Sequence, residues 1–183
     1  MQSAAILAVF DTPDDVLITA ATAGGKTEAA FLPILSRIHE APAASVQALY
    51  VGPLKALINN QFDRLEELCR KAEIPVTKWH GDASDSGKDR LVQSPSGVLQ
   101  ITPESIESLL LNRARFLEPM LSGLEFVVID EVHTFLDSDR GLQLRSQLER
   151  LGRYSKKRPR RIGLSATIGD PEQAKRWLNA DPA

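Results

Sequence analysis

The sequence predicts an α/β domain with a mostly parallel sheet, and two observations support this prediction. Short apolar, β-branched runs alternate with longer segments in which Leu or Ile recurs at helical spacing. Strands separated by amphipathic helices form βαβ units, in which helices cover both faces of the sheet. Right-handed crossovers then bring the carboxyl ends of the strands, with the loops that follow them, to one edge.

The apolar runs are the expected strands, and the segments with helical periodicity are the expected helices. Strands are predicted at Val16–Ala20, Val46–Val51, Val76–Trp79, Val98–Ile101, Phe126–Ile129 and Ile162–Leu164. The helices are predicted at Thr27–Ile38, Leu54–Glu73, Pro103–Leu111 and Leu142–Leu151, with a short one near Trp177 and Leu178.

Length and composition favour a single domain over residues 1–183. Of the 183 residues, 43% are hydrophobic and 25% are charged, which suits one sizeable core. The net charge of −2 gives no overall attraction to nucleic acid, so such binding would need a local surface. The lone cysteine, Cys69, lies at helical spacing from Leu65 and favours a buried thiol. The apolar stretch Ala4–Phe10 is too short to cross a membrane, and we expect a cytoplasmic protein.

A glycine-rich turn, Ala20–Thr27, follows the first predicted strand and opens the first predicted helix. This order of a strand, a loop of small residues ending in Gly-Lys-Thr and then a helix is typical of a nucleotide-binding site. The backbone N–H groups of such a loop and of the helix start surround the phosphates. Lys26 would reach the β- and γ-phosphates of ATP, and the Thr27 hydroxyl would bind Mg²⁺. Ala20 replaces the first glycine of the general G-x-x-x-x-G-K-[ST] pattern, so the motif alone leaves a plain surface turn open.

Two acids follow the fifth predicted strand, at the edge expected to hold the phosphate loop. Asp130 would bind Mg²⁺ directly or through water, and Glu131 would orient and deprotonate the attacking water. The alternative is a helix start, with Asp130 as the cap and Glu131 favourable to the helix dipole. Because Lys26 and Thr27 follow another strand of the same sheet, we favour the catalytic interpretation.

Short motifs follow the other predicted strands in a fixed order: Pro53-Leu54-Lys55, Thr102-Pro103-Glu104 and Ser165-Ala166-Thr167. Together with Gly-Lys-Thr and Asp-Glu-Val-His, they resemble the first RecA-like domain of a superfamily 2 DExH helicase. Thr27–Pro33, Arg140-Gly141 and Arg161–Thr167 resemble the Lhr and Ski2-like branch. The resemblance covers nearly the whole chain and implies a RecA-like, three-layer fold whose ATP hydrolysis drives movement on nucleic acid.

The resemblance also implies roles around the nucleotide. His133 would link the γ-phosphate to Ser165 and Thr167, which would couple the ATP state to the strand. A histidine satisfied within a helix, and hydroxyls that only cap helices, are the alternatives. Gln2 is a candidate for a glutamine that reads adenine, although its spacing is loose. The implied phosphate-binding residues are Ala23, Gly24, Gly25, Lys26, Thr27 and Glu28, with Ala23 at a position where the family has glycine.

The resemblance further implies a nucleic acid partner, a single strand with DNA favoured over RNA. Helix starts after Pro53 and Thr102 would offer N–H groups to backbone phosphates, although proline-led helix starts also occur without a ligand. A second RecA-like domain would supply arginine fingers, which are worth about 10³–10⁵ in rate. We therefore expect this chain alone to bind nucleotide weakly and to hydrolyse it poorly. The implied contact residues are Pro53, Leu54, Lys55, Gly81, Asp82, Thr102, Pro103 and Glu104.

The basic run Arg153–Arg161 can attract phosphates, but it precedes the sixth strand and so lies at the edge opposite the other motifs. We favour a solvated loop there. Two other functions remain open: an ATPase that moves along duplex without unwinding it, and a nucleotide-binding module without turnover. Intact Lys26, Asp130 and Glu131 argue against the module.

Overall fold

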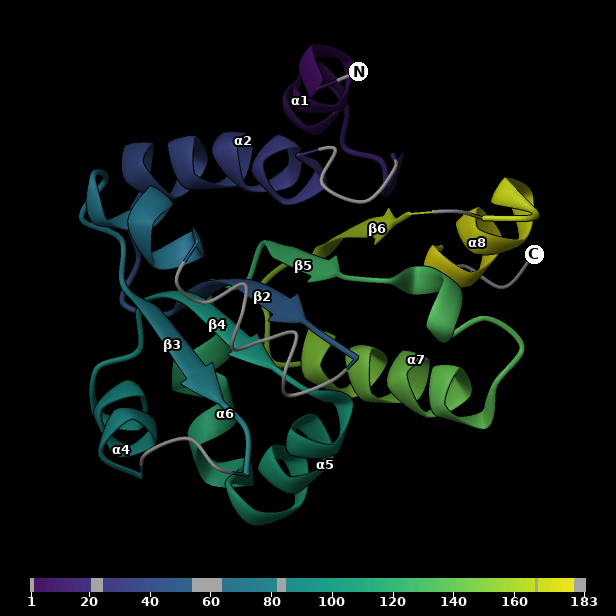
Figure 1. Ribbon diagram of the computed structural model, residues 1–183. Helices are drawn as coiled ribbons and strands as arrows, with labels where there is room; N and C mark the ends of the chain where they lie inside the picture. The colour runs from purple at the N-terminus through teal and green to yellow at the C-terminus, as the bar shows by residue number, and fades with distance from the viewer. Residues whose placement is uncertain (1, 21–24, 54–63, 82–84, 167, 180–183) are drawn as a thin grey trace.

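The computed structural model describes residues 2–20, 25–53, 64–81, 85–166 and 168–179. Within them the chain forms a six-stranded sheet in the order β1-β6-β5-β2-β4-β3, and every neighbouring pair of strands is parallel (Figure 1). The strands are β1 (Val16–Thr19), β2 (Val46–Val51), β3 (Val76–Trp79), β4 (Gly97–Ile101), β5 (Phe126–Ile129) and β6 (Arg160–Ser165).

Helices cover both faces of the sheet, which gives the three layers that the sequence predicts. α2 (Lys26–Glu40) and the helical residues 64–70 pack on one face, and α1 (Gln2–Asp11) packs on α2. The other face is covered by α5 (Pro103–Asn112), α6 (Ala114–Leu121), α7 (Asp139–Gly152) and α8 (Pro171–Leu178) (Figure 1). α4 (Asp85–Gln93) lies beside β3, and the 3₁₀ turn η1 (Val132–Thr134) follows β5.

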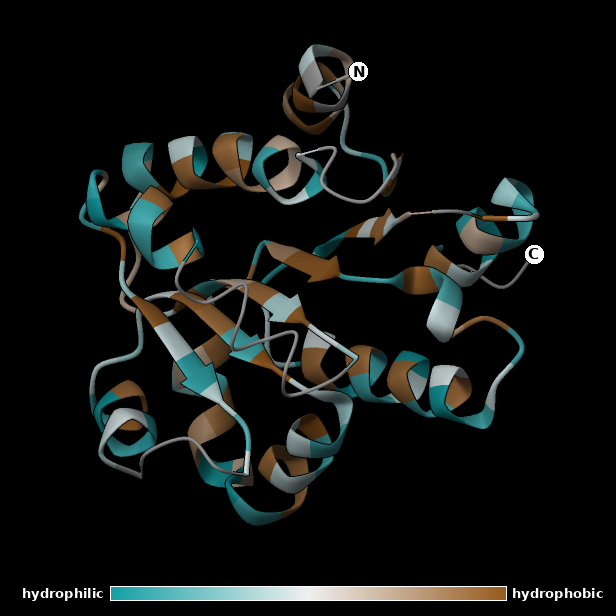
Figure 2. Cartoon of the chain, in the orientation of Figure 1, coloured by the Kyte–Doolittle hydropathy of each residue, from teal (hydrophilic) through white to brown (hydrophobic). Residues whose placement is uncertain are grey.

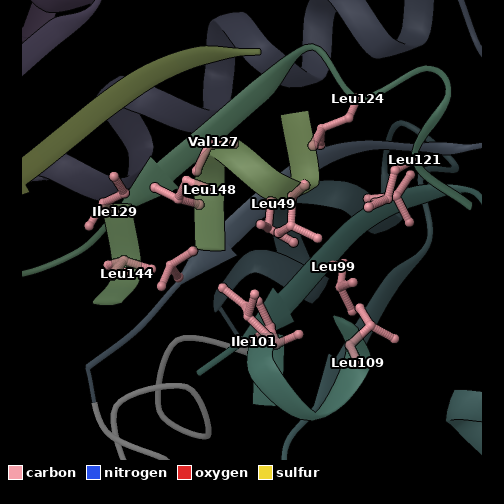
Figure 3. Close-up of a cluster of buried hydrophobic side chains, with 14 of the residues drawn as sticks. Leu49, Leu99, Ile101, Leu109, Leu121, Leu124, Val127, Ile129, Leu144 and Leu148 are labelled. Atoms are coloured by element: carbon pink, nitrogen blue, oxygen red, sulfur yellow. The ribbon is translucent and has the colours of Figure 1, made fainter. Parts of the chain in front are cut away.

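Alternation along the strands builds a separate core on each face. Leu49 of β2 lies in the core on the α7 side, in one cluster with Val127, Leu144 and Leu148 (Figure 3). Tyr50, the next residue, points to the α2 side. Figure 2 shows the central strand β5 hydrophobic along its length, whereas the edge strand β3 carries hydrophilic residues. A strand buried on both faces needs apolar residues at consecutive positions, which explains the continuous runs in the sequence.

The predicted fold class is confirmed, and β2, β3 and β5 have the predicted bounds. β6 begins two residues earlier than predicted, at Arg160, because charged residues interrupt the apolar pattern there. The sequence analysis did not predict α1, α4 or α6; α6 contains Pro119, and α4 is mostly polar. Of the predicted helix Leu54–Glu73, residues 64–70 are helical and 54–63 lie outside the described residues.

Two smaller expectations also have an outcome. Cys69 is buried as predicted, and burial raises the pKa of its thiol to about 12, so the thiol stays protonated. Among the described residues, no helix has both the length and the apolar composition needed to cross a bilayer.

Candidate functional site

The site lies where β1, β6 and β5, three neighbouring strands, end at the same edge of the sheet. The backbone ties these ends together, since the Ala20 N–H donates to the Ser165 carbonyl at 3.2 Å. Lys26 returns to the end of β1, where its Nζ donates to the Ala20 carbonyl at 2.9 Å. The Lys26 ammonium is also close enough to Asp130 to favour the ionised carboxylate. The structure thus brings Lys26, Asp130 and Ser165 together, as the strand order predicts.

The start of α2 has the local geometry of a phosphate-binding helix end. Gly25 caps the helix with a φ of 69°, a left-handed conformation that favours glycine. It has no side chain to cap the first turn, and Thr27 in that turn is only 7% exposed. Open N–H groups at a helix start are the usual binding site for phosphate. Ala23 and Gly24 lie outside the described residues.

Asp130 is held in one orientation by hydrogen bonds on both of its carboxylate oxygens. Oδ2 accepts from the Tyr50 hydroxyl, and Oδ1 accepts from the Glu131 N–H at 2.9 Å. Its own N–H donates to the Val51 carbonyl at 2.9 Å, which continues the sheet ladder past the end of β5. The side chain is 4% exposed, and this burial raises the pKa of Asp130 above its usual range, against the opposing effects of Tyr50 and Lys26.

Glu131 and His133 form a short polar cluster on η1. Glu131 adopts a φ of 49°, which turns the chain sharply after Asp130, and it makes no side-chain cap of η1. His133 Nδ1 lies 2.9 Å from the Ser165 hydroxyl oxygen and 3.2 Å from Glu131 Oε2. Only the first of these contacts has hydrogen-bond geometry, so buried Oε2 has no hydrogen-bond partner among the described residues. The helix-start alternative expects a side-chain cap here, and the Glu131 side chain makes no such hydrogen bond to η1.

Tyr50 is a site residue that the sequence analysis missed. It is fully buried in β2, its ring packs against Phe31 with centroids 5.8 Å apart, and its hydroxyl meets Asp130. A signal was present, because a buried tyrosine hydroxyl needs a partner. Tyr50 pairs in register with Val128, and Asp130 lies two residues further along on the same face of the sheet.

The described residues that were expected to contact nucleic acid follow β2, β3 and β4 along the same edge of the sheet. Thr102 is 2% exposed and caps α5, where its Oγ1 accepts from the Ser105 N–H at 3.3 Å. Pro103 opens that helix, and Glu104 in its first turn pairs with Arg140 of α7. Pro53 is buried at the end of the β2 ladder, whereas Gly81 is exposed after β3.

Several of the predicted site residues cannot be placed. Leu54, Lys55, Asp82 and Thr167 lie outside the described residues, as does the side chain of Gln2, the first residue of α1. Glu28 is placed, and its Oε1 accepts from Arg64 while Oε2 is buried without a partner among the described residues.

The basic run lies at the opposite edge of the sheet, as predicted. Lys156 and Lys157 are exposed, but Arg160 and Arg161 are buried and belong to β6. The expectation of a solvated loop does not hold for these two residues. The Arg160 guanidinium donates to the Val9 carbonyl near the end of α1, and the Arg161 guanidinium donates to the Leu178 carbonyl.

An all-parallel sheet with a lysine, an Asp-Glu pair and a histidine–serine contact at its carboxyl edge defines the RecA-like ATP-binding domain of helicases. The chain belongs to the DEAD/DEAH box helicase family, whose model matches residues 1–175.

Relatives and solved structures place it near the Lhr helicases. It is 35% identical to the Lhr helicase/probable uracil glycosylase of Mycolicibacterium smegmatis over 91% of this chain and 12% of the relative. It is also 35% identical to the ATP-dependent helicase Lhr-Core of Methanothermobacter thermautotrophicus over 90% of this chain and 20% of the relative.

A solved structure of Mycobacterium smegmatis helicase Lhr bound to ssDNA and AMP-PNP superimposes with a TM-score of 0.85 and 32% identity, over 97% of this chain and 24% of that one. The resemblance to the first RecA-like domain of the Lhr branch is confirmed. The chain spans between 12% and 20% of the length of these two relatives.

Proposed function

We propose that this domain binds Mg·ATP and hydrolyses it to drive movement along a nucleic acid strand. The observation that carries the proposal is the convergence of Lys26, Asp130, Glu131 and the His133–Ser165 pair at one edge of the sheet. ATP hydrolysis coupled to motion requires a cation that binds the phosphates, a carboxylate that binds the metal and a general base. It also requires a contact that links the ATP site to the neighbouring strand β6.

The described residues fit Mg²⁺ and the phosphates of ATP. Thr27 supplies a hydroxyl and Asp130 a fixed carboxylate, both oxygen ligands that suit this ion. No three His, Cys, Asp or Glu side chains converge in the part of the chain that the structure describes, so phosphate and water would complete the ion's shell. When bound, Mg²⁺ neutralises charge that develops on the β- and γ-phosphate oxygens. Gly25, Lys26 and Thr27 hold the phosphates, with Ala23, Gly24 and Glu28 beside them.

Glu131 is the general base in this proposal. Its buried Oε2 lacks a hydrogen-bond partner among the described residues, and such an oxygen is a natural acceptor for a water proton. Asp130 suits the metal instead, because Tyr50 and the Glu131 N–H fix its carboxylate in one orientation.

The His133–Ser165 contact supports a coupling role for both residues, and we assign the same role to Thr167 from its motif. His133 follows the base by two residues, and Ser165 ends β6, so a change at the γ-phosphate passes directly to the neighbouring strand. Loops at the ends of β2, β3 and β4 then hold the nucleic acid through Pro53, Gly81, Thr102, Pro103 and Glu104, and the same motifs assign Leu54, Lys55 and Asp82 to this contact.

We propose that the nucleic acid is single-stranded and that DNA is favoured over RNA, because the Lhr helicase with a similar structure was solved with ssDNA. A second RecA-like domain completes the catalytic site with its arginine, so turnover by this domain alone is low. Gln2 is the candidate for reading adenine.

The first experiment is a titration with a fluorescent ATP analogue, with and without Mg²⁺, using Lys26→Ala and the exposed Lys71→Ala as a matched pair. ATP turnover is then measured with and without single-stranded DNA and RNA. We expect Mg²⁺-dependent binding that Lys26→Ala abolishes and Lys71→Ala retains. Binding that survives Lys26→Ala, or no binding by the wild type, would contradict the proposal.

A further inference from the structure

Arg140, at the start of α7, joins segments that are far apart in the sequence. Its Nε donates to Glu104 Oε1 at 2.9 Å, and its Nη2 lies 2.8 Å from the same oxygen. Nη2 also donates to the Pro53 carbonyl, and the guanidinium carbon lies 5.4 Å from the centre of the Phe135 ring. One side chain therefore contacts the loop after β2, the helix after β4 and the segment after η1.

The turn before α7 is built to present this arginine. Ser138 caps the helix, because its Oγ donates to the Phe135 carbonyl at 3.0 Å and accepts from the Gly141 N–H at 3.1 Å. A β-carbon on Gly141 would lie 1.7 Å from the Phe135 carbonyl oxygen, so only glycine lets this turn close. The Arg-Gly pair thus has a physical basis: glycine closes the turn, and arginine reaches across it.

The charge of Arg140 is balanced within the domain. Its partner Glu104 stays ionised, since burial alone would raise the pKa of this carboxyl, but the carboxyl's own backbone N–H and Arg140 lower it. Nε and Nη2 of this guanidinium are engaged by the carboxylate and the carbonyl, so a direct contact with a phosphate would have to come from Nη1.

Phe135, which Arg140 contacts, is connected through the backbone to the proposed site of ATP hydrolysis. Phe135 donates its N–H to the Val132 carbonyl at 2.9 Å, and Thr134 donates its N–H to the Glu131 carbonyl at 2.8 Å. η1 therefore connects the base Glu131 to the ring that Arg140 contacts. The Phe135 ring also stacks on Trp177 of α8 at 6.0 Å, which fixes it in position.

We propose that Arg140 is a positioning residue that transmits the state of the ATP site to the nucleic-acid loops by holding Pro53 and Glu104 to η1. The inference deepens the proposed function and rests on it. Packed side chains and hydrogen bonds of this kind can carry coupling between two sites. The coupling is measured as the effect of one ligand on the affinity for the other, and closeness of the two sites alone does not demonstrate it.

The domain contains a matched control for this link. Arg150 and Glu107 pair at 3.0 Å between the same two helices, α7 and α5, and Gln147 also donates to Glu107 at 3.1 Å. The Arg150 guanidinium donates to both carboxylate oxygens of Glu107, which lies within α5 and outside the loops of the site. Arg150→Gln thus removes an equivalent ion pair between α5 and α7 while leaving the link to η1 intact.

The experiment measures the affinity of the intact protein for a labelled single-stranded DNA by fluorescence anisotropy, with and without Mg·AMP-PNP. The ratio of the two affinities is the coupling factor. We expect Arg140→Gln to bring this factor at least about fivefold closer to one, and Arg150→Gln to leave it unchanged. Affinity for Mg·AMP-PNP without DNA should change less than about twofold in both variants, and thermal unfolding confirms that each variant is folded.

Salt dependence separates positioning from direct contact. If Arg140 itself neutralised a phosphate, Arg140→Gln would reduce the slope of log affinity against log salt by about one. We expect no change in slope, and a reduction would overturn the inference. A wild-type coupling factor that persists in Arg140→Gln would overturn the inference alone. A wild-type protein without coupling, or without binding of either ligand, would overturn the proposed function and this inference together.

Discussion

The two edges of the sheet use charge in opposite ways. The amino edge carries the densest run of cations, Arg153–Arg161, whereas the candidate ATP site at the carboxyl edge combines Lys26 with two acids, Asp130 and Glu131. Charge density alone would place an anion-binding site at the amino edge. The candidate site nevertheless lies at the carboxyl edge.

At the amino edge the buried arginines are committed to the fold. Arg160 Nη2 donates to the Ala8 carbonyl at 2.8 Å and to Thr12 Oγ1 at 3.1 Å. Its other nitrogens donate to the carbonyls of Val9 and Asp14. The guanidinium thus replaces the helical partners that the last carbonyls of α1 lack. A cation held in this way stabilises the structure and is not available to a ligand.

At the carboxyl edge the polar groups are incompletely satisfied. Oε2 of Glu131 and Oε2 of Glu28 are buried without hydrogen-bond partners among the described residues. Asp130 is buried, and its carboxyl has a raised pKa. Buried groups left in this state oppose folding and are expected where a ligand completes them. The two edges therefore differ in how their charged groups are paired, and net charge alone does not separate them.

The largest effect is expected for Glu131→Gln. This change removes the base but keeps its shape, so we expect ATP turnover of the intact protein to fall by about 10²–10⁴-fold while nucleotide affinity is retained. Steady-state turnover and analogue titration measure the two quantities. Glu149→Gln is the control from the amino edge, where Glu149 pairs with Arg161. Equal turnover in Glu131→Gln and wild type would show that Glu131 is not the general base.

Arg160→Met should show that the amino edge serves stability. The change leaves the carbonyls of Ala8, Val9 and Asp14 without this donor, so we expect the free energy of unfolding to fall by about 3 kcal/mol. Urea denaturation measures it. Arg153→Met changes an exposed arginine of the same run and should leave the unfolding midpoint unchanged. A tolerated Arg160→Met would mean that α1 does not depend on this side chain.

The sequence predicted the sheet well because β2 and β5 are buried on both faces and so consist of continuous apolar residues. It also placed Lys26, Asp130 and Ser165 at one edge, since parallel strands leave no other arrangement. It missed Arg160 as a strand residue and Tyr50 as a partner of Asp130, because both roles depend on contacts between distant segments. Arg140 was noted only for its motif, since its partners Pro53 and Glu104 are far away in the chain.

Asp130→Asn should stabilise the protein in the absence of nucleotide. Burial raises the pKa of Asp130, so its contribution to stability is present below the pKa of the unfolded chain and is lost as the pH rises through the raised folded value. At neutral pH the ionised carboxylate therefore opposes folding, and replacing it should raise the free energy of unfolding by about 1 kcal/mol.

Denaturation at neutral and acidic pH measures this effect, and the gain should disappear in acid, where wild-type Asp130 is protonated. Asp89→Asn, at an exposed position on α4, should show no such gain. Mg·nucleotide should reverse the order by stabilising only the wild type. A destabilised Asp130→Asn at neutral pH would mean that the bonds from Tyr50 and the Glu131 N–H outweigh burial.

The smallest effect is expected for Lys156→Ala combined with Lys157→Ala. Both lysines are exposed at the amino edge, away from the loops after β2 and β4, so nucleic acid affinity and its salt dependence should both stay unchanged. Anisotropy over a range of salt concentrations measures the slope. Two lost phosphate contacts would make the slope shallower by between one and two. Such a change would show that exposed cations of the amino edge bind nucleic acid after all, and that only its buried arginines are structural.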